Sequence, residues 1–294
     1  MPAAGPGWRG PLAALRGADA VRLSLVGFLG LAVASWAFVL ADGAGGFGAL
    51  FTGSAWAGVR RFLGELAGEG AAGAPAFLDA GQWAEAGVLA SETLAMSILA
   101  ITLASSGVLL TVLPAARNVA MGELVPAGRG AALWKGLYLL VRGVFVLTRG
   151  VPELVWAMII VFFLSPGILP GALALALHNY GILGKLSAEV VEDLDTRPAR
   201  SLQGAGARPF QMMAYGILPQ VLPQLITYTL YRWEVVIRTT IVVGFVSAGG
   251  LGRDFRLSMS FFHYTDVALL LMWYVLLVIG VDLLSGWLRS RVRS

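Results

Sequence analysis

The sequence contains no cysteine and only two histidines among its 294 residues. Without cysteine the chain has neither a disulfide framework nor a thiolate metal site. The histidines, His178 and His263, each stand alone among apolar or aromatic residues, so we expect packing side chains rather than metal ligands. We therefore expect no metal site and no catalytic constellation of nucleophile and base.

Lysine is almost as scarce, and its scarcity excludes a nucleotide-binding loop. The lysines are Lys135 and Lys185, and neither stands in a G-x-x-x-x-G-K-[ST] pattern. That pattern cradles the phosphates of ATP. We therefore expect that the chain binds no cofactor and is not an enzyme, and that a partner subunit binds and hydrolyses any ATP.

Charged residues make up only 13% of the chain, whereas 57% is hydrophobic and the mean hydropathy is +0.78. Soluble domains carry about 25% charged residues, so this composition is typical of a membrane protein. Apolar stretches long enough to cross a bilayer recur along the chain. They cover residues 23–41, 90–116, 133–164, 169–190, 210–247 and 264–288. We predict an all-α polytopic membrane protein with six transmembrane helices.

The stretch 133–164 is too long for one straight span, since a helix of its 32 residues would extend about 48 Å. We expect a bend at Pro152. The segment 165–171, Ser-Pro-Gly-Ile-Leu-Pro-Gly, holds two prolines and two glycines, which predicts a turn that no helix enters. The stretches on either side of this turn are expected to form a hairpin.

Basic residues between the apolar stretches concentrate on one side of the membrane. Because Lys and Arg in loops are retained in the cytoplasm, this side is predicted to be cytoplasmic. It carries Arg9, Arg16, Arg22, Arg117, Arg129, Lys135, Lys185, Arg197, Arg200, Arg208, Arg289, Arg291 and Arg293. The opposite side carries Arg60, Arg61, Arg253 and Arg256. Both termini are therefore predicted to be cytoplasmic.

These assignments predict five segments along the chain. They are a cytoplasmic tail (1–20), a first transmembrane helix (21–42), an external loop (43–85), a core (86–294) and, within the core, a cytoplasmic loop at about 185–209. For the external loop we favour a solvated linker, with an amphipathic helix near Val59–Leu66 as the alternative. For the first helix, a signal anchor without another role is the alternative.

The cytoplasmic loop contains a short polar helix in an otherwise apolar sequence. Pro198 suits a first helical turn, with Asp195 or Thr196 near the cap. The small residues at 204–206 allow the backbone of another protein to approach closely. The loop is thus predicted to dock a partner, and an ordinary amphipathic connector is the alternative.

The spacing in this loop resembles the cytoplasmic loop of ABC-importer permeases. The family pattern is Glu-Ala-Ala, three residues, Gly, nine residues, Ile, one residue and Leu-Pro. Arg200 and Gly216 take the Glu and Ile positions, and the residues that match are Ser201, Leu202, Gly206, Leu218 and Pro219. The resemblance implies a coupling helix that docks in a groove of the ATPase subunit. We therefore expect the five matching residues and Arg200 to form the ATPase-coupling site.

Further segments are similar to successive landmarks of the phosphonate permease branch. They are Glu92–Met96, Arg149–Trp156, Tyr228–Glu234, Ile237–Arg238 and Ser247–Gly252. The resemblance covers about residues 86–290. It implies a MetI-like, type I core of five helices, preceded here by one extra helix, that moves a phosphonate or a related phosphorus oxyanion such as phosphate or phosphite.

The same resemblance implies a multi-subunit complex in the bacterial inner membrane. The expected partners are cytoplasmic ABC ATPase subunits, a second copy of the permease, an external substrate-binding protein and the lipid bilayer. No nucleic-acid partner is expected.

Four charged residues within the spans are candidates for the translocation pathway, namely Arg149, Glu153, Glu234 and Arg238. Each Glu and Arg stand four residues apart, so both pairs are expected to meet on one helical face. Structural ion pairs are the alternative to a pathway role. Arg232 is placed near an interface instead.

Gly249, Gly250 and Gly252 are expected at an external gate, a position implied by the resemblance. Glycine permits positive φ and close approach of helices, and a plain turn is the alternative.

The nearest alternative function is an ABC importer for another small solute. A proton-coupled secondary transporter would favour an unpaired acid or a histidine relay in the spans, whereas the acids here mostly have arginine neighbours. An intramembrane enzyme would need a nucleophile or a metal constellation, which this composition does not supply.

Overall fold

The computed structural model describes residues 11–41, 48, 51–70, 73–122 and 130–293, and the regular elements in these ranges are all helices. The chain divides into two compact units, Met1–Gly64 and Glu65–Ser294. The predicted all-α polytopic class is confirmed within the described residues.

The first unit holds helix α1 (Pro11–Ala41) and helix α2 (Gly53–Leu66) up to Gly64. The stretch Ala20–Ala41 of α1 is long and apolar enough to cross a membrane. Helix α2 lies in the segment for which we favoured a solvated linker, and it buries none of its residues. The helical alternative is therefore correct, although the helix begins six residues before Val59.

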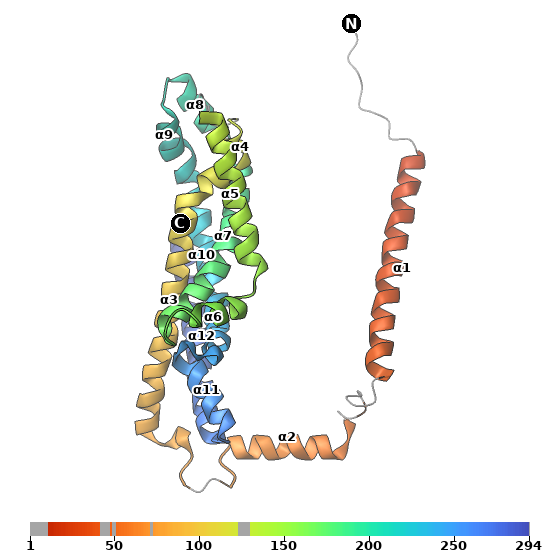
Figure 1. The fold of residues 1–294 in the computed structure, drawn as a ribbon, viewed down its shortest axis with the longest axis vertical. Helices are drawn as coiled ribbons and strands as arrows, with labels where there is room; N and C mark the ends of the chain where they lie inside the picture. The colour runs from red at the N-terminus through yellow and green to blue at the C-terminus, as the bar shows by residue number, and fades with distance from the viewer. Residues whose placement is uncertain (1–10, 42–47, 49–50, 71–72, 123–129, 294) are drawn as a thin grey trace. The chain divides into compact units, whose positions relative to one another are not determined.

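The second unit contains the remaining helices (Figure 1). They are η2 (Ala76–Leu78), α3 (Ala80–Ala115), α4 (Arg117–Ala120), α5 (Ala131–Gly150), α6 (Glu153–Val161), α7 (Ile168–Glu192), α8 (Arg197–Gly204), α9 (Pro209–Gln211), η4 (Met212–Ile217), α10 (Leu218–Val243), η5 (Gly244–Ala248), α11 (Gly250–Ser260) and α12 (Tyr264–Arg293).

Helices α3 and α7 form the centre of the second unit, and α5, α6, α10 and α12 pack around them. Two glycines let α5 approach α7 closely. A Cβ atom at Gly181 would clash with the hydroxyl of Thr148, and one at Gly184 would clash with the ring of Phe145. Small residues at helix interfaces are typical of membrane proteins, where close packing replaces the hydrophobic effect between helices.

The predicted bend at Pro152 is confirmed. Val151 is extended, with φ −94° and ψ 123°, as expected for a residue that precedes proline. The prediction of a helix-free turn at 165–171 is wrong, because α7 begins at Ile168 and includes Pro170 in its first turn. Proline is tolerated there because the first N–H groups of a helix have no intrahelical partner.

The predicted number of six spans is not confirmed. Among the described residues, four helices are long and apolar enough to cross a membrane, or five if Pro209–Val246 and Gly250–Ser260, which meet at 51°, form one bent span. Helix α7 is not among them although it has 25 residues and lies in the core. The polar residues His178, Asn179 and Lys185 lower its hydropathy.

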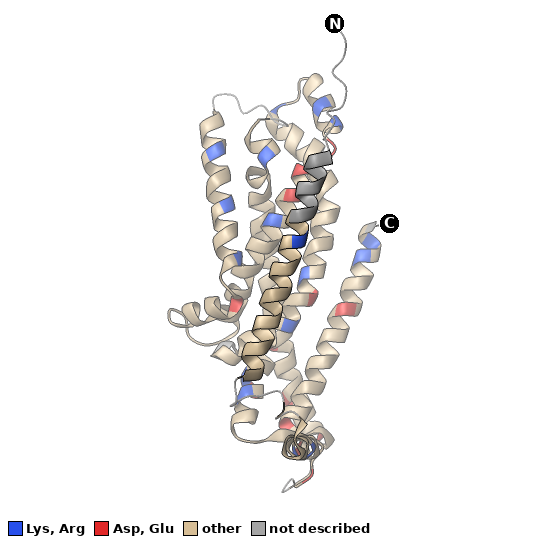
Figure 2. Ribbon diagram, turned by 90° about the vertical axis from the view of Figure 1, so that its right-hand side faces the viewer, with Lys and Arg blue, Asp and Glu red and all other residues tan. Residues whose placement is uncertain are grey.

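The second unit has distinct ends. Helices α8 and α9 lie at one end and α11 at the other, and α12 runs from the α11 end back toward the α8 end (Figure 1). Charged residues occur along the helices as well as at their ends (Figure 2). Most of the predicted site residues are charged residues along these helices or lie at the α8 end.

Candidate functional site

The predicted helix in the cytoplasmic loop is present as α8. The carboxylate of Asp195 accepts a hydrogen bond from the backbone N–H of Arg197 at 3.0 Å, and Pro198 lies in the first turn. The hydroxyl of Ser201 donates to the carbonyl of Arg197 at 3.0 Å. Arg200 and Ser201 are exposed, whereas Leu202 is half-buried. The loop thus offers a polar outer surface on a helix fixed at its start.

Gly206 has a local role that the sequence analysis did not identify. Its φ is +83°, and no atom would lie within 4 Å of an added Cβ. Two backbone bonds of 3.0 Å, from Gly206 N–H to the Gln203 carbonyl and from Ala207 N–H to the Leu202 carbonyl, form a Schellman motif. The left-handed conformation therefore explains this glycine without any approaching partner.

Gly216 takes the Ile position of the family pattern because α8 packs directly on it. A Cβ atom at Gly216 would lie 3.1 Å from Leu202 Cδ1 and 3.2 Å from Ala199 Cα. Ala199 is fully buried by this contact. The departure from the pattern therefore brings α8 against η4, just before Leu218 and Pro219 begin α10.

Two exposed aromatic residues beside α8 were missed by the sequence analysis. Phe210 in α9 and Tyr215 in η4 are each 74% exposed. Aromatic residues are enriched at interfaces and depleted from surfaces that face only water. The signal in the sequence was the pair of aromatics between Arg208 and Leu218, directly after the polar loop and at the start of the apolar stretch 210–247.

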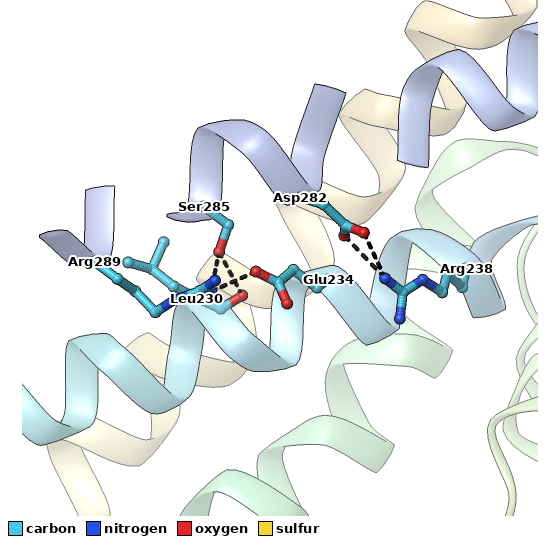
Figure 3. Close-up of polar contacts among 6 residues, drawn as sticks. All are labelled: Leu230, Glu234, Arg238, Asp282, Ser285 and Arg289. Atoms are coloured by element: carbon cyan, nitrogen blue, oxygen red, sulfur yellow. Dashed lines mark hydrogen bonds and ion pairs between the residues drawn. The ribbon is translucent and has the colours of Figure 1, made fainter. Parts of the chain in front are cut away.

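The predicted ion pair between Glu234 and Arg238 is wrong (Figure 3). Glu234 pairs instead with Arg289 of α12, which also donates to the hydroxyl of Ser285 at 2.6 Å. Arg238 binds both carboxylate oxygens of Asp282, at 2.7 and 3.0 Å. Helix α12 packs along α10, so its charges compete successfully with a neighbour on the same helix.

The second predicted pair, Arg149 with Glu153, is also wrong. The helix is broken between these residues at Pro152, so they do not share a helical face. Glu153 lies 3.4 Å from His178 Nε2, and His178 Nδ1 is 3.0 Å from the carbonyl of Val151. His178 is thus not isolated among apolar groups, and His263 likewise lies 3.6 Å from the carboxylate of Asp266.

Arg232 was placed near an interface by the sequence, but its side chain faces α7. Its Nε donates to the amide oxygen of Asn179, whose own nitrogen donates to the carbonyl of Leu175 at 2.6 Å. Asn179 is only 1% exposed. Arg232 also interacts electrostatically with Glu153, so α6, α7 and α10 contribute to one polar cluster inside the bundle.

The glycine segment after α10 has the positive φ and the close contacts that were expected. Gly249 and Gly250 have φ of +97° and +66°. A Cβ at Gly252 would clash with the carbonyl of Ile241. The segment is also held to α3, where the hydroxyl of Thr93 accepts a hydrogen bond from the N–H of Leu251 at 2.9 Å.

Glu92, the residue before Thr93, accepts a hydrogen bond from the N–H of Gly250 at 3.2 Å. Two side chains of α3 thus satisfy N–H groups at the start of α11, which have no partner within that helix. This contact gives a structural reason for the Glu92–Met96 landmark and joins it to the glycine segment.

The bundle, with several apolar helices long enough to cross a membrane, half-buried charges and a short polar helix at one end, is that of a multi-pass membrane protein. Residues 125–294 match the family model of the binding-protein-dependent transport system inner membrane component. The chain belongs to this family, and it is accordingly a multi-pass protein of the inner membrane.

The relatives of this chain include permeases of phosphite, phosphate and phosphonate transport systems. The phosphite transport system permease protein PtxC of Stutzerimonas stutzeri is 38% identical over 202 residues, which are 69% of each chain. The phosphate-import permease protein PhnE of Mycolicibacterium smegmatis (strain ATCC 700084 / mc(2)155) is 33% identical over 202 residues, which are 69% of this chain and 36% of that protein. The putative cryptic phosphonate transport system permease protein PhnE2 of Escherichia coli (strain K12) is 38% identical over 118 residues, which are 40% of this chain and 97% of that protein.

Solved structures confirm the fold. A chain of the MetNI methionine ABC transporter, from its inward facing native crystal form, has a TM-score of 0.53 at 19% identity and covers 69% of this chain and 94% of that one. A chain of an amino acid ABC transporter with histidines has a TM-score of 0.51 at 17% identity, covering 68% and 90%. At these identities the likeness concerns the fold alone, and this fold is the predicted MetI-like permease fold.

Proposed function

We propose that this chain is the translocating subunit of an ABC importer for a phosphorus oxyanion, such as a phosphonate, phosphite or phosphate. The observation that carries the proposal is the identity of 33–38% to permeases of phosphite, phosphate and phosphonate systems. The cationic side chains inside the bundle are compatible with an anionic substrate, since an anion in a region of low dielectric constant needs compensating positive charge.

ATP is hydrolysed by a partner subunit in this proposal, and the chain itself holds no cofactor. The α8 end is the docking surface for that subunit. Support comes from the exposed Arg200 and Ser201 on α8 and from the exposed rings of Phe210 and Tyr215 beside it. A hydrophobic centre with a polar rim is typical of protein interfaces.

A second permease copy and an external binding protein complete the proposed complex. Arg149, Glu153, Glu234 and Arg238 remain our predicted pathway residues, although their ion-pair partners differ from those expected. Arg238 and Asp282 are 47% and 38% exposed on their side chains. A charged pair with this exposure would be costly in contact with lipid. Its exposure therefore supports a location where the pair faces water or the second permease.

The mechanism requires movement of α8 with the ATPase subunits. Closure of the ATPase dimer shifts α8, and α8 transmits the shift to η4 and α10 through the contact of Ala199 and Leu202 with Gly216. The glycine segment 249–252, at the other end of α10, then acts as the external gate. No residue of this chain takes part in covalent chemistry.

The proposal is tested by assaying ATP hydrolysis of the purified chain alone and of the chain assembled with its ATPase subunit in lipid nanodiscs. We expect no hydrolysis by the isolated chain and hydrolysis by the assembled complex. Turnover by the isolated chain, at the rate of the complex, would contradict the proposal.

A further inference from the structure

We propose that Arg232 is the residue of the permease that contacts the transported anion. The inference rests on the proposed function, because it takes a phosphorus oxyanion as the substrate. It differs from the sequence-based expectation, which favoured Arg149 and Arg238 and placed Arg232 at an interface.

The terminal nitrogens of Arg232 are available to a ligand. Its guanidinium makes one hydrogen bond, from Nε to Asn179. Neither terminal nitrogen has a hydrogen-bond partner among the described residues. Neither nitrogen is sealed inside the protein, since the fully enclosed side-chain atoms without partners belong to Asn118 and Ser187. Both nitrogens of the fork that binds oxyanions in a bidentate manner are therefore without a protein partner and keep some accessible surface.

Other arginines of the second unit have at least one terminal nitrogen bound to a carboxylate. Arg142 pairs with a carboxylate and donates to a backbone carbonyl. Arg238 is held by both oxygens of its carboxylate partner, and Arg289 by a carboxylate and a hydroxyl. An anion would compete with these carboxylates for the guanidinium.

Like Arg232, Arg149 forms no ion pair with the described residues. Unlike Arg232, it has no hydrogen bond among them that orients its guanidinium. Arg232, by contrast, is oriented by Asn179, which is buried and fixed by its own bond to Leu175. A side chain that is already oriented loses less conformational entropy when it binds a ligand. The geometry therefore favours Arg232.

Glu153 balances Arg232 only in part. Its carboxylate interacts electrostatically with Arg232 but makes its closest charged contact with His178, at 3.4 Å. This arrangement lowers the cost of holding a cation within the membrane while leaving the fork of Arg232 without a direct partner. The carboxylate competes with an anionic substrate, so its removal should strengthen anion binding.

The test uses the full complex of permease, ATPase and binding protein in proteoliposomes, with uptake of phosphite, phosphate and methylphosphonate as the measurement. We expect uptake by wild type, and loss of at least about tenfold in Arg232→Gln, since a hydrogen bond to a charged group contributes about 1.5 kcal/mol or more. Gln keeps an N–H donor for Asn179, so loss of that hydrogen bond alone does not account for the expected fall in uptake. Arg61→Gln, which removes an exposed charge from α2, is the matched control and should transport normally.

A second measurement separates anion contact from a structural ion pair. Radiolabelled phosphate is bound at equilibrium to the complex without its binding protein, and Arg232→Gln should weaken this affinity while Glu153→Gln should strengthen it. A structural pair predicts that both variants lose affinity together with stability. If Arg232→Gln does not assemble, Arg232→Lys carries the test, because it keeps the charge but not the fork, and unchanged affinity in it would overturn the inference.

The outcomes distinguish the two levels of the argument. Wild-type complex that takes up none of the three anions would contradict the proposed function. Wild-type complex that transports them, together with an Arg232→Gln variant of equal uptake and equal phosphate affinity, would contradict the inference alone.

Discussion

The guanidinium of Arg238 binds the carboxylate of Asp282 across the interface of α10 and α12, with the shorter contact at 2.7 Å (Figure 3). A second charge of α10, on Glu234, is balanced in the same way by Arg289 of α12. The two pairs lie about one helical turn of α10 apart along the same interface. Helix α12 therefore supplies the counter-charges of Glu234 and Arg238, and these two charges have no such partner until α12 packs against α10.

This relationship predicts which double substitution restores stability. Arg238→Gln alone leaves Asp282 unpaired and should lower the free energy of unfolding by about 1–3 kcal/mol, between the values for exposed and for buried pairs. Adding Asp282→Asn should recover much of that loss. Adding Glu234→Gln instead should increase the loss, because it leaves Arg289 unpaired as well. Thermal unfolding of the purified permease in detergent distinguishes the two, and recovery in the Glu234 double variant would contradict the pairing.

Gly206 predicts a substitution series at the end of α8. Gly206→Ala should destabilise the left-handed helix end by about 1–2 kcal/mol, whereas Gly206→Asn should be milder, because Asn tolerates this conformation. Copurification of the ATPase should fall in the order Gly, Asn, Ala. Gly204→Ala is the matched control, since residue 204 is helical and an added Cβ meets no atom within 4 Å. Equal effects at positions 204 and 206 would show that helix-end geometry is irrelevant to docking.

Gly216 predicts that restoring the family residue is harmful in this chain. Gly216→Ile should push Leu202 and Ala199 away and displace α8 from η4. Gly216→Ala should do so less, because the neighbouring atoms at 3.1 and 3.2 Å need to move only a few tenths of an ångström. The expected result is membrane insertion at wild-type level with ATPase copurification reduced in proportion to side-chain size. Normal copurification in Gly216→Ile would contradict the role of this contact.

The exposed aromatics predict a loss of partner binding without a loss of stability. Phe210→Ser combined with Tyr215→Ser should leave the melting temperature nearly unchanged, since surface substitutions shift stability by about 0.5 kcal/mol or less. Affinity for the ATPase should fall by about 30-fold or more, because buried interface aromatics often contribute about 2 kcal/mol. Phe261→Ser, at the opposite end of the second unit, is the control. An equal loss of ATPase affinity in the control would contradict the assignment of the docking surface.

Features that depend on local chemistry were predictable from the sequence. The bend at Pro152, the hydrogen bond of Asp195 at the start of α8 and the positive φ of Gly249 follow from rules that act within a few residues. Composition also predicted the all-α membrane class, because little else is compatible with 13% charged residues.

Features that depend on distant partners were not predictable. A spacing of four residues suggested that Glu234 meets Arg238. Only the packing of the helices shows that α12 lies beside α10 and brings Asp282 and Arg289 to these two residues. The role of Arg232 was missed for the same reason, since Asn179 is 53 residues away. Turn composition misled at 165–171, where Pro170 lies inside the first turn of α7 rather than in a loop.

The proposed function is inward movement of a phosphorus oxyanion at the expense of ATP hydrolysed by a partner. Its most direct test is accumulation of phosphite, phosphate or methylphosphonate in proteoliposomes that contain the permease with its ATPase and binding protein. We expect accumulation that requires ATP on the α8 side and that is absent when either the ATPase or the binding protein is left out. Accumulation driven by a proton gradient, with the permease alone and without ATP, would contradict it.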